Sequence, residues 1–190
     1  SHRLNVADPA GLMAHTFRGL LRQAGVEVEG GLATAARVPV GAVRVSAQES
    51  PPLADLLYGL NRYSNNFMAE MLLRTMGGAV AGLPGTADKG VVVIRRTLGQ
   101  LGVPEREVAL DSGSGLSRSC RVSARAFGAV LVDAYTDFSI APEFLASMAV
   151  NSREGTLKKR LRRAEVTVRG KTGTLKDVVG FAGYVAGPDG

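Results

Sequence analysis

A hairpin pattern near the end of the chain constrains the fold most strongly. Val166-Thr167-Val168 leads into a predicted strand, a turn falls near Lys176-Asp177, and Val179, Phe181 and Val185 alternate on the returning strand. Two strands joined by a turn pair antiparallel, and one face of such a pair packs against other apolar elements. Most of the preceding chain has a helical pattern. We therefore expect an α/β (α+β) fold in which helices pack on an antiparallel sheet.

The helices are predicted from apolar residues at helical spacing and from the residues that cap them. Asp8-Pro9 is an N-cap followed by proline in the first turn, and Gly25 ends the helix that starts there. Further helices are expected at about residues 53–61, 66–76, 91–101, 123–134 and 143–148, with Gly77-Gly78 ending the second of these. Short strands are expected at Val26–Val28, Val43–Val45 and Glu107–Leu110. No internal repeat or linker interrupts the pattern, which favours a single domain over residues 1–190.

Composition and charge narrow the function classes. Hydrophobic residues make up 45% of the chain, enough for a folded core. No apolar run reaches the roughly 20 residues of a membrane span. No basic-then-apolar leader opens the sequence, and any export signal is expected upstream of Ser1. The formal net charge is +6, and residues 158–163, Lys-Lys-Arg-Leu-Arg-Arg, are its densest basic run. Because no aromatic residue interleaves that run, we interpret it as the solvated face of a helix and expect no nucleic-acid binding. A net positive domain would also suit an anionic polymer.

The rare residue types give little support to metal or redox chemistry. Cys120 is the only cysteine, so no internal disulfide can form, and we interpret it as a small buried residue. The only histidines are His2 and His15, and neither has another metal-ligand type beside it. We therefore expect no metal and no cofactor.

Two short motifs carry the chemistry. Ser64-Asn65-Asn66 lies at a predicted helix start, and Lys171-Thr172-Gly173 lies on the first strand of the hairpin. They match two of the three motifs of penicillin-recognising serine acyl-transferases. The third motif, Ser-x-x-Lys, carries the nucleophile, and no serine of the chain is followed three residues later by lysine. The sequence resembles most of an active site without its attacking atom.

Each motif residue has a chemical reason to be there. The Ser64 hydroxyl both donates and accepts, so it can relay a proton to a leaving amine, and the Asn66 amide can hold a substrate amide. Lys171 supplies a cation beside that serine and attracts a substrate carboxylate. The hydroxyls of Thr172 and Thr174 can bind the same carboxylate, and the Thr174 N–H is an expected oxyanion donor. Gly173 leaves room for an extended peptide along the strand edge.

A glycine- and serine-rich loop, Asp111 to Arg118, separates the two motifs. Its glycine spacing fits neither dinucleotide-binding nor phosphate-binding loops. It either supports the site as a tight turn or contacts substrate directly, and we favour support. Ser114 and Ser117 lack a following helical lysine that could serve as a base, so neither is expected to replace the missing nucleophile.

Together these segments resemble the C-terminal part of class C low-molecular-mass penicillin-binding proteins, which are bacterial D-alanyl-D-alanine carboxypeptidase/endopeptidases. The resemblance rests on Tyr63–Glu70, Pro84-Gly85-Thr86, Asp111–Arg118, Glu154-Gly155-Thr156-Leu157 and Lys171–Leu175. Where the family commonly has Asp between the serine and the asparagine of its first motif, this chain has Asn65, which we interpret as a structural neighbour.

The resemblance implies a penicillin-binding-protein/serine β-lactamase-like fold, present here as an incomplete, single transpeptidase-like domain. It implies a serine enzyme of the periplasm or bacterial cell envelope that cleaves peptidoglycan peptides ending in D-Ala-D-Ala through an acyl-enzyme and is acylated by β-lactams in the complete protein. In the family, long inserted domains separate the Ser-x-x-Lys helix from the next motif. The nucleophile would then lie outside this chain, and the chain alone would be inactive.

Two other functions remain open from the sequence. One is a non-catalytic module that retains the groove and binds wall peptides or a partner protein. The other is a serine β-lactamase, which the Ser-Gly-Ser-Gly-Leu-Ser-Arg loop disfavours because it resembles the carboxypeptidases.

Overall fold

The computed structural model describes residues 6–32, 38 and 40–187. The chain divides into two compact units, Ser1–Glu49 and Ser50–Gly190. In the first unit, α1 (Pro9–Gln23) begins with the Asp8 carboxylate accepting a hydrogen bond from the Gly11 N–H at 2.9 Å. The predicted first helix and its end before Gly25 are confirmed. The prediction of a single domain over residues 1–190 stays a prediction.

The two strands predicted at Val26–Val28 and Val43–Val45 are wrong. Both segments are irregular, and neither forms a ladder with another part of the chain that the structure describes. β-propensity alone does not hold a strand, because an extended segment needs a paired neighbour and a covered face.

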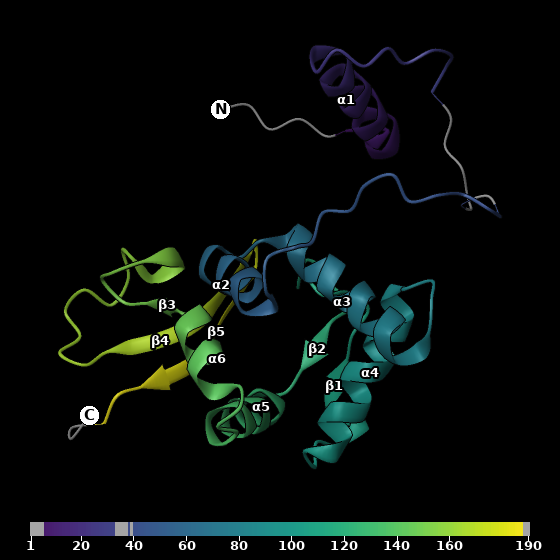
Figure 1. Cartoon of the computed structure of the whole chain (residues 1–190). Helices are drawn as coiled ribbons and strands as arrows, with labels where there is room; N and C mark the ends of the chain where they lie inside the picture. The colour runs from purple at the N-terminus through teal and green to yellow at the C-terminus, as the bar shows by residue number, and fades with distance from the viewer. Residues whose placement is uncertain (1–5, 33–37, 39, 188–190) are drawn as a thin grey trace. The chain divides into compact units, whose positions relative to one another are not determined.

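The second unit contains the remaining helices, and Figure 1 shows their arrangement. They are α2 (Leu53–Tyr63), α3 (Asn66–Ala81), α4 (Ala87–Gln100), α5 (Ala124–Thr136) and α6 (Ala141–Ser147). Helix α2 packs against α6, and α3 packs against α4. The side chains of Thr86 and Ser123 cap α4 and α5 by accepting backbone N–H bonds. The five helices of this unit that are predicted from apolar spacing are all present.

The prediction that Gly77-Gly78 ends a helix is wrong, because α3 continues to Ala81. Both glycines are buried. A Cβ on Gly77 would lie 2.6 Å from the backbone nitrogen of Gly90 on α4. Gly77 therefore lets α4 approach α3 closely, Gly78 makes room for the segment Leu83–Gly85, and neither glycine ends the helix.

Two small antiparallel sheets complete the second unit. β1 (Val108–Ala109) pairs with β2 (Arg121–Val122), and β3 (Ala149–Val150), β4 (Val168–Leu175) and β5 (Val178–Val185) form a sheet in the order β3-β4-β5. The predicted hairpin is confirmed as β4 and β5. The strand predicted at Glu107–Leu110 is reduced to β1, since Glu107 belongs to the short turn η1 (Glu105–Glu107).

The main apolar cluster lies between α4, α5 and the β1–β2 pair. It is formed by Leu98, Val103, Val108 and Ala126, with Ile94, Leu110 and Val130 packed against it.

The basic run does not form the predicted helix. After η2 (Gly155–Leu157), residues 158–163 make irregular turns, and all six are exposed. Leu161 has a φ of 52° there, which a right-handed helix does not allow.

Candidate active site

Ser64 lies at a sharp break between two helices. Helix α2 ends at Tyr63, and Ser64 follows as its C-cap in the left-handed region, with φ 58° and ψ 55°. Asn65 is the N-cap of α3, and its side-chain oxygen accepts the Met68 N–H at 3.1 Å. This role explains Asn65 as a structural neighbour, and an aspartate could cap the helix in the same way.

The end of α2 that carries Ser64 is tied to distant parts of the unit. The Arg62 side chain is buried, donates to the Ala146 carbonyl at 2.7 Å, and pairs with the Glu154 carboxylate. Its guanidinium also lies 3.5 Å from the centroid of the Tyr58 ring. Asn61 donates to the Ser147 hydroxyl at 2.8 Å. The sequence reasoning gave Arg62 and Asn61 no role. The sequence feature that could have pointed to Arg62 is the segment Glu154-Gly155-Thr156-Leu157, which belongs to the family resemblance but was given no contact.

Lys171 lies on β4 and brings the two motifs together. Its Nζ donates to the Ser64 hydroxyl oxygen at 2.8 Å and to the Thr172 carbonyl at 2.7 Å. The contact joins residues 107 positions apart in sequence. Desolvation by burial lowers the pKa of Lys171 below its usual value. The expectation that Lys171 lies beside Ser64 is confirmed.

The other predicted site residues lie on the same two elements. Asn66 is the first residue of α3 and is exposed, so its amide is available to a ligand. On β4, Thr172 is 9% exposed, while Gly173 and Thr174 are exposed. Alternation along a strand places Thr172 and Thr174 on one face. The roles of these four residues toward a substrate stay predictions.

The edge of β4 next to this cluster is open over part of its length. Strand β3 pairs with Arg169 and Gly170 only, so residues 171–175 have no strand partner on that side among the residues that the structure describes. A Cβ built on Gly173 meets no atom within 4 Å. The strand therefore offers space and backbone groups to an extended peptide beside Lys171.

The Asp111–Arg118 loop connects β1 to β2 and is braced by its own side chains. The Asp111 carboxylate accepts hydrogen bonds from Ser117 Oγ at 2.8 Å and from Cys120 Sγ at 3.2 Å. These bonds, that from Ser117 foremost, lower the pKa of Asp111. Cys120 is half-buried and acts as a donor to the loop.

The same loop is anchored to α3. The Ser114 N–H donates to Glu70 Oε1 at 3.0 Å, and hydrogen bonding from Ser114 lowers the pKa of Glu70. A Cβ on Gly113 would lie 2.6 Å from the Ala69 carbonyl oxygen, so only glycine fits this approach. Internal bracing and helix contacts agree with the interpretation of the loop as a support.

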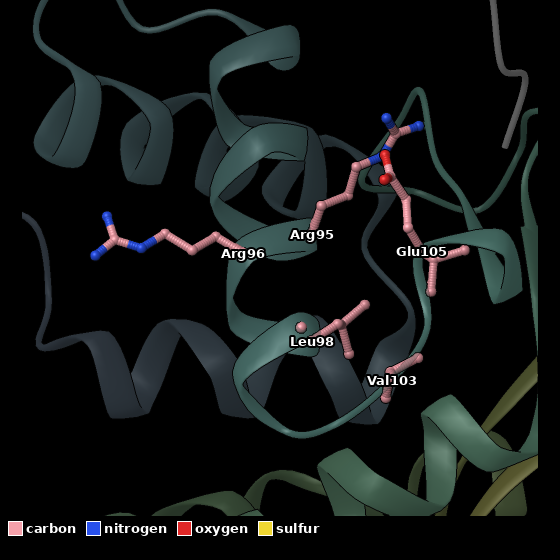
Figure 2. Close-up of a pocket in the computed structure, with 7 residues that line it drawn as sticks. Arg95, Arg96, Leu98, Val103 and Glu105 are labelled. Carbon is pink, nitrogen blue, oxygen red and sulfur yellow. The ribbon is translucent and has the colours of Figure 1, made fainter.

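A pocket of about 320 Å³ lies elsewhere in the unit, along α4 and the turn that follows it (Figure 2). Its apolar lining includes Leu98, Val103 and Val108. Arg96 points away from the other labelled side chains in Figure 2. The pocket shares no lining residue with the Ser64–Lys171 cluster.

In the described ranges, no three His, Cys, Asp or Glu side chains gather as a metal site would require. No described helix has the length and apolar character to cross a bilayer.

Comparison with known proteins agrees with the motifs. The family model described as D-Ala-D-Ala carboxypeptidase 3 (S13) matches residues 1–190. A D-alanyl-D-alanine carboxypeptidase of Actinomadura sp. (strain R39) is 36% identical over 97% of this chain and 36% of that protein. The carboxypeptidase DacB of Haemophilus influenzae is 27% identical over 93% of this chain and 37% of its own length.

A solved structure gives the same fold. Penicillin binding protein 4 (dacB) of Haemophilus influenzae, crystallised with a β-lactam, superposes with a TM-score of 0.84 at 23% identity, over 98% of this chain and 43% of that one. The chain thus spans well under half the length of the relatives it matches. The predicted fold of this chain, helices packed on an antiparallel sheet, is therefore confirmed, and it is the fold of that penicillin-binding protein. From the family match over its whole length, the chain belongs to the D-Ala-D-Ala carboxypeptidase 3 (S13) family.

Proposed function

We propose that this chain supplies the relay and carboxylate-binding half of a serine D-Ala-D-Ala carboxypeptidase/endopeptidase that acts on peptidoglycan stem peptides. The observation that carries the proposal is the 2.8 Å hydrogen bond from Lys171 Nζ to Ser64 Oγ beside the open edge of β4. A hydroxyl held by an ammonium is oriented to accept a proton and to pass it on. The family match and the names of the relatives support the same reaction class.

The reaction needs a nucleophile, and we place it on a Ser-x-x-Lys helix outside this chain. That serine would attack the carbonyl of the penultimate D-alanine, and the terminal D-alanine would leave as an amine after receiving a proton through Ser64. Water would then hydrolyse the acyl-enzyme. Asn66 would hold the substrate amide, and Lys171, Thr172 and Thr174 would bind the terminal carboxylate, with Gly173 leaving the strand edge free.

This assignment implies further properties of the complete protein. β-Lactams would acylate the same serine, because their amide carbonyl occupies the place of the scissile bond. The enzyme would work in the periplasm or cell envelope, where its polymer substrate lies. The 190-residue chain by itself would be inactive.

Labelling with a fluorescent penicillin tests the proposal. The protein translated from the full reading frame should show a covalent band, Ser64→Ala and Lys171→Ala should slow its formation, and the chain alone should stay unlabelled. Covalent labelling of the chain alone would contradict the position of the nucleophile. A full reading frame without Ser-x-x-Lys would instead favour the alternative, a binding module that keeps the groove.

A further inference from the structure

The segment between η2 and β4, residues 158–166, is a strongly basic loop. Its cations are Lys158, Lys159, Arg160, Arg162 and Arg163, and all five are exposed. None of them forms an ion pair or a side-chain hydrogen bond within residues 6–32, 38 and 40–187. One exposed carboxylate, Glu165, lies in the same loop. The loop follows η2 and returns to β4 at one end of the three-stranded sheet (Figure 1).

A buried asparagine holds this basic loop in shape. Asn151 is 7% exposed, and its amide donates to the carbonyls of Leu161 at 3.4 Å and Val166 at 3.2 Å. Its side-chain oxygen accepts the Val168 N–H at 2.8 Å. One buried side chain therefore fixes both the middle of the loop and its return to the sheet, and the cations are presented from a built frame.

Leu161 sits in the middle of the cations in an uncommon conformation. Its φ of 52° lies in the left-handed region, which costs an L-residue conformational free energy unless the surroundings hold it. Its carbonyl accepts from Asn151 and from the Ala164 N–H at 3.1 Å, while its side chain is 49% exposed. The frame thus presents an apolar side chain with basic residues on both sides.

We propose that the basic loop is a docking surface for an anionic lipid bilayer. The cations meet headgroup phosphates, and the Leu161 side chain enters the boundary between headgroups and acyl chains. A nucleic acid fits less well, because residues 158–166 contain no aromatic side chain on which bases could stack. A soluble polyphosphate would use the cations and would gain nothing from Leu161. This surface does not depend on the activity proposed above.

Vesicle co-sedimentation of the full-length protein at low salt tests the proposal. Binding to vesicles of phosphatidylglycerol and phosphatidylcholine should exceed binding to pure phosphatidylcholine and should weaken as salt is raised. Lys159→Gln/Arg162→Gln should reduce affinity by about fivefold per cation. Leu161→Ser should reduce it by roughly threefold to tenfold. The matched control is Arg95→Gln/Arg96→Gln, which removes two exposed charges from α4 and should leave vesicle binding unchanged.

Three outcomes would overturn the proposal. The first is that both loop variants sediment with anionic vesicles as strongly as the unmodified protein. The second is that the α4 control loses as much affinity as the loop variants, which would assign binding to overall charge. The third is that soluble polyphosphate or DNA binds as tightly as the vesicles and Leu161→Ser has no effect on vesicle binding, which would assign the loop to a polyanion.

Discussion

The ion pair between the buried Arg62 and the partly exposed Glu154 offers the sharpest test of how the site is held. The two side chains differ in burial, because that of Arg62 is 6% exposed and that of Glu154 is 36% exposed. Removing either partner therefore leaves the other in a different environment. Glu154→Ala leaves a guanidinium cation buried without its counter-charge, whereas Arg62→Met leaves a carboxylate that water can reach.

The expected free energies follow from this asymmetry. Glu154→Ala should lower the free energy of unfolding by about 3–5 kcal/mol, the usual cost of an uncompensated buried charge. Arg62→Met keeps much of the side-chain volume and should cost about 1–3 kcal/mol, chiefly because the Ala146 carbonyl near the end of α6 loses its donor. The double variant removes the stranded cation and should be more stable than Glu154→Ala alone, by about 1–3 kcal/mol.

Urea denaturation followed by far-UV circular dichroism measures all three variants. The control is the pair between Arg118 and Asp177, whose side chains are 54% and 73% exposed, and whose removal should cost less than about 1 kcal/mol. The reasoning fails if Glu154→Ala costs no more than this control. It also fails if the double variant is less stable than Glu154→Ala, since the stranded cation would then not be the cause.

Three further changes test other parts of the site. Gly113→Ala forces a Cβ against the Ala69 carbonyl and should cost about 1–3 kcal/mol by thermal denaturation, whereas Gly99→Ala, with open space around it, should not destabilise. Burial lowers the pKa of Lys171 below its usual value of 10.5, so its ammonium is deprotonated at a lower pH than that of an exposed lysine. Penicillin acylation by the complete protein should therefore fall as the pH rises through this lowered pKa. The fall should be absent in Lys171→Arg, because a guanidinium stays charged. Asn65→Ala removes the cap of α3 and should cost about 1 kcal/mol in urea denaturation, while Asn65→Asp should retain stability; equal loss in both would contradict the capping role.

Helices could be predicted from the sequence because their signals are local. Asp8, Thr86 and Ser123 each cap the helix that follows, and the apolar spacing inside each helix needs no distant partner. The prediction that Gly77-Gly78 ends a helix failed because the reason for these glycines is not local. A helix tolerates a glycine at a modest cost, and these two make room for α4 and for the segment Leu83–Gly85, whose approach no local pattern records.

The site shows the same division between local and distant information. The Lys171–Ser64 contact was predictable only because two motifs resembled a family, since nothing near either residue specifies a partner 107 positions away. Arg62 carries no such signal: an arginine at the end of an amphipathic helix is ordinarily solvated, and its burial depends on Glu154 and Ala146, 92 and 84 positions distant. The strands predicted near Val26 and Val43 failed because β-propensity does not supply a pairing partner.

The contact between Ser64 and Lys171 depends on elements of the second unit alone. Helix α2 brings Ser64 to the break before α3, Arg62 ties that helix end to α6 and to the Glu154 turn, and β4 carries Lys171. Each connection is a hydrogen bond or ion pair within residues 50–187, so the Ser64–Lys171 pair is preorganised by this part of the chain. A variant that loosens Arg62 should therefore disturb Ser64 before it disturbs Lys171, because the ammonium keeps its bond to the Thr172 carbonyl within its own strand. In the complete protein, Arg62→Met should slow acylation by penicillin, with less effect on carboxylate binding. An equal loss in both would show that Ser64 and Lys171 are not held separately.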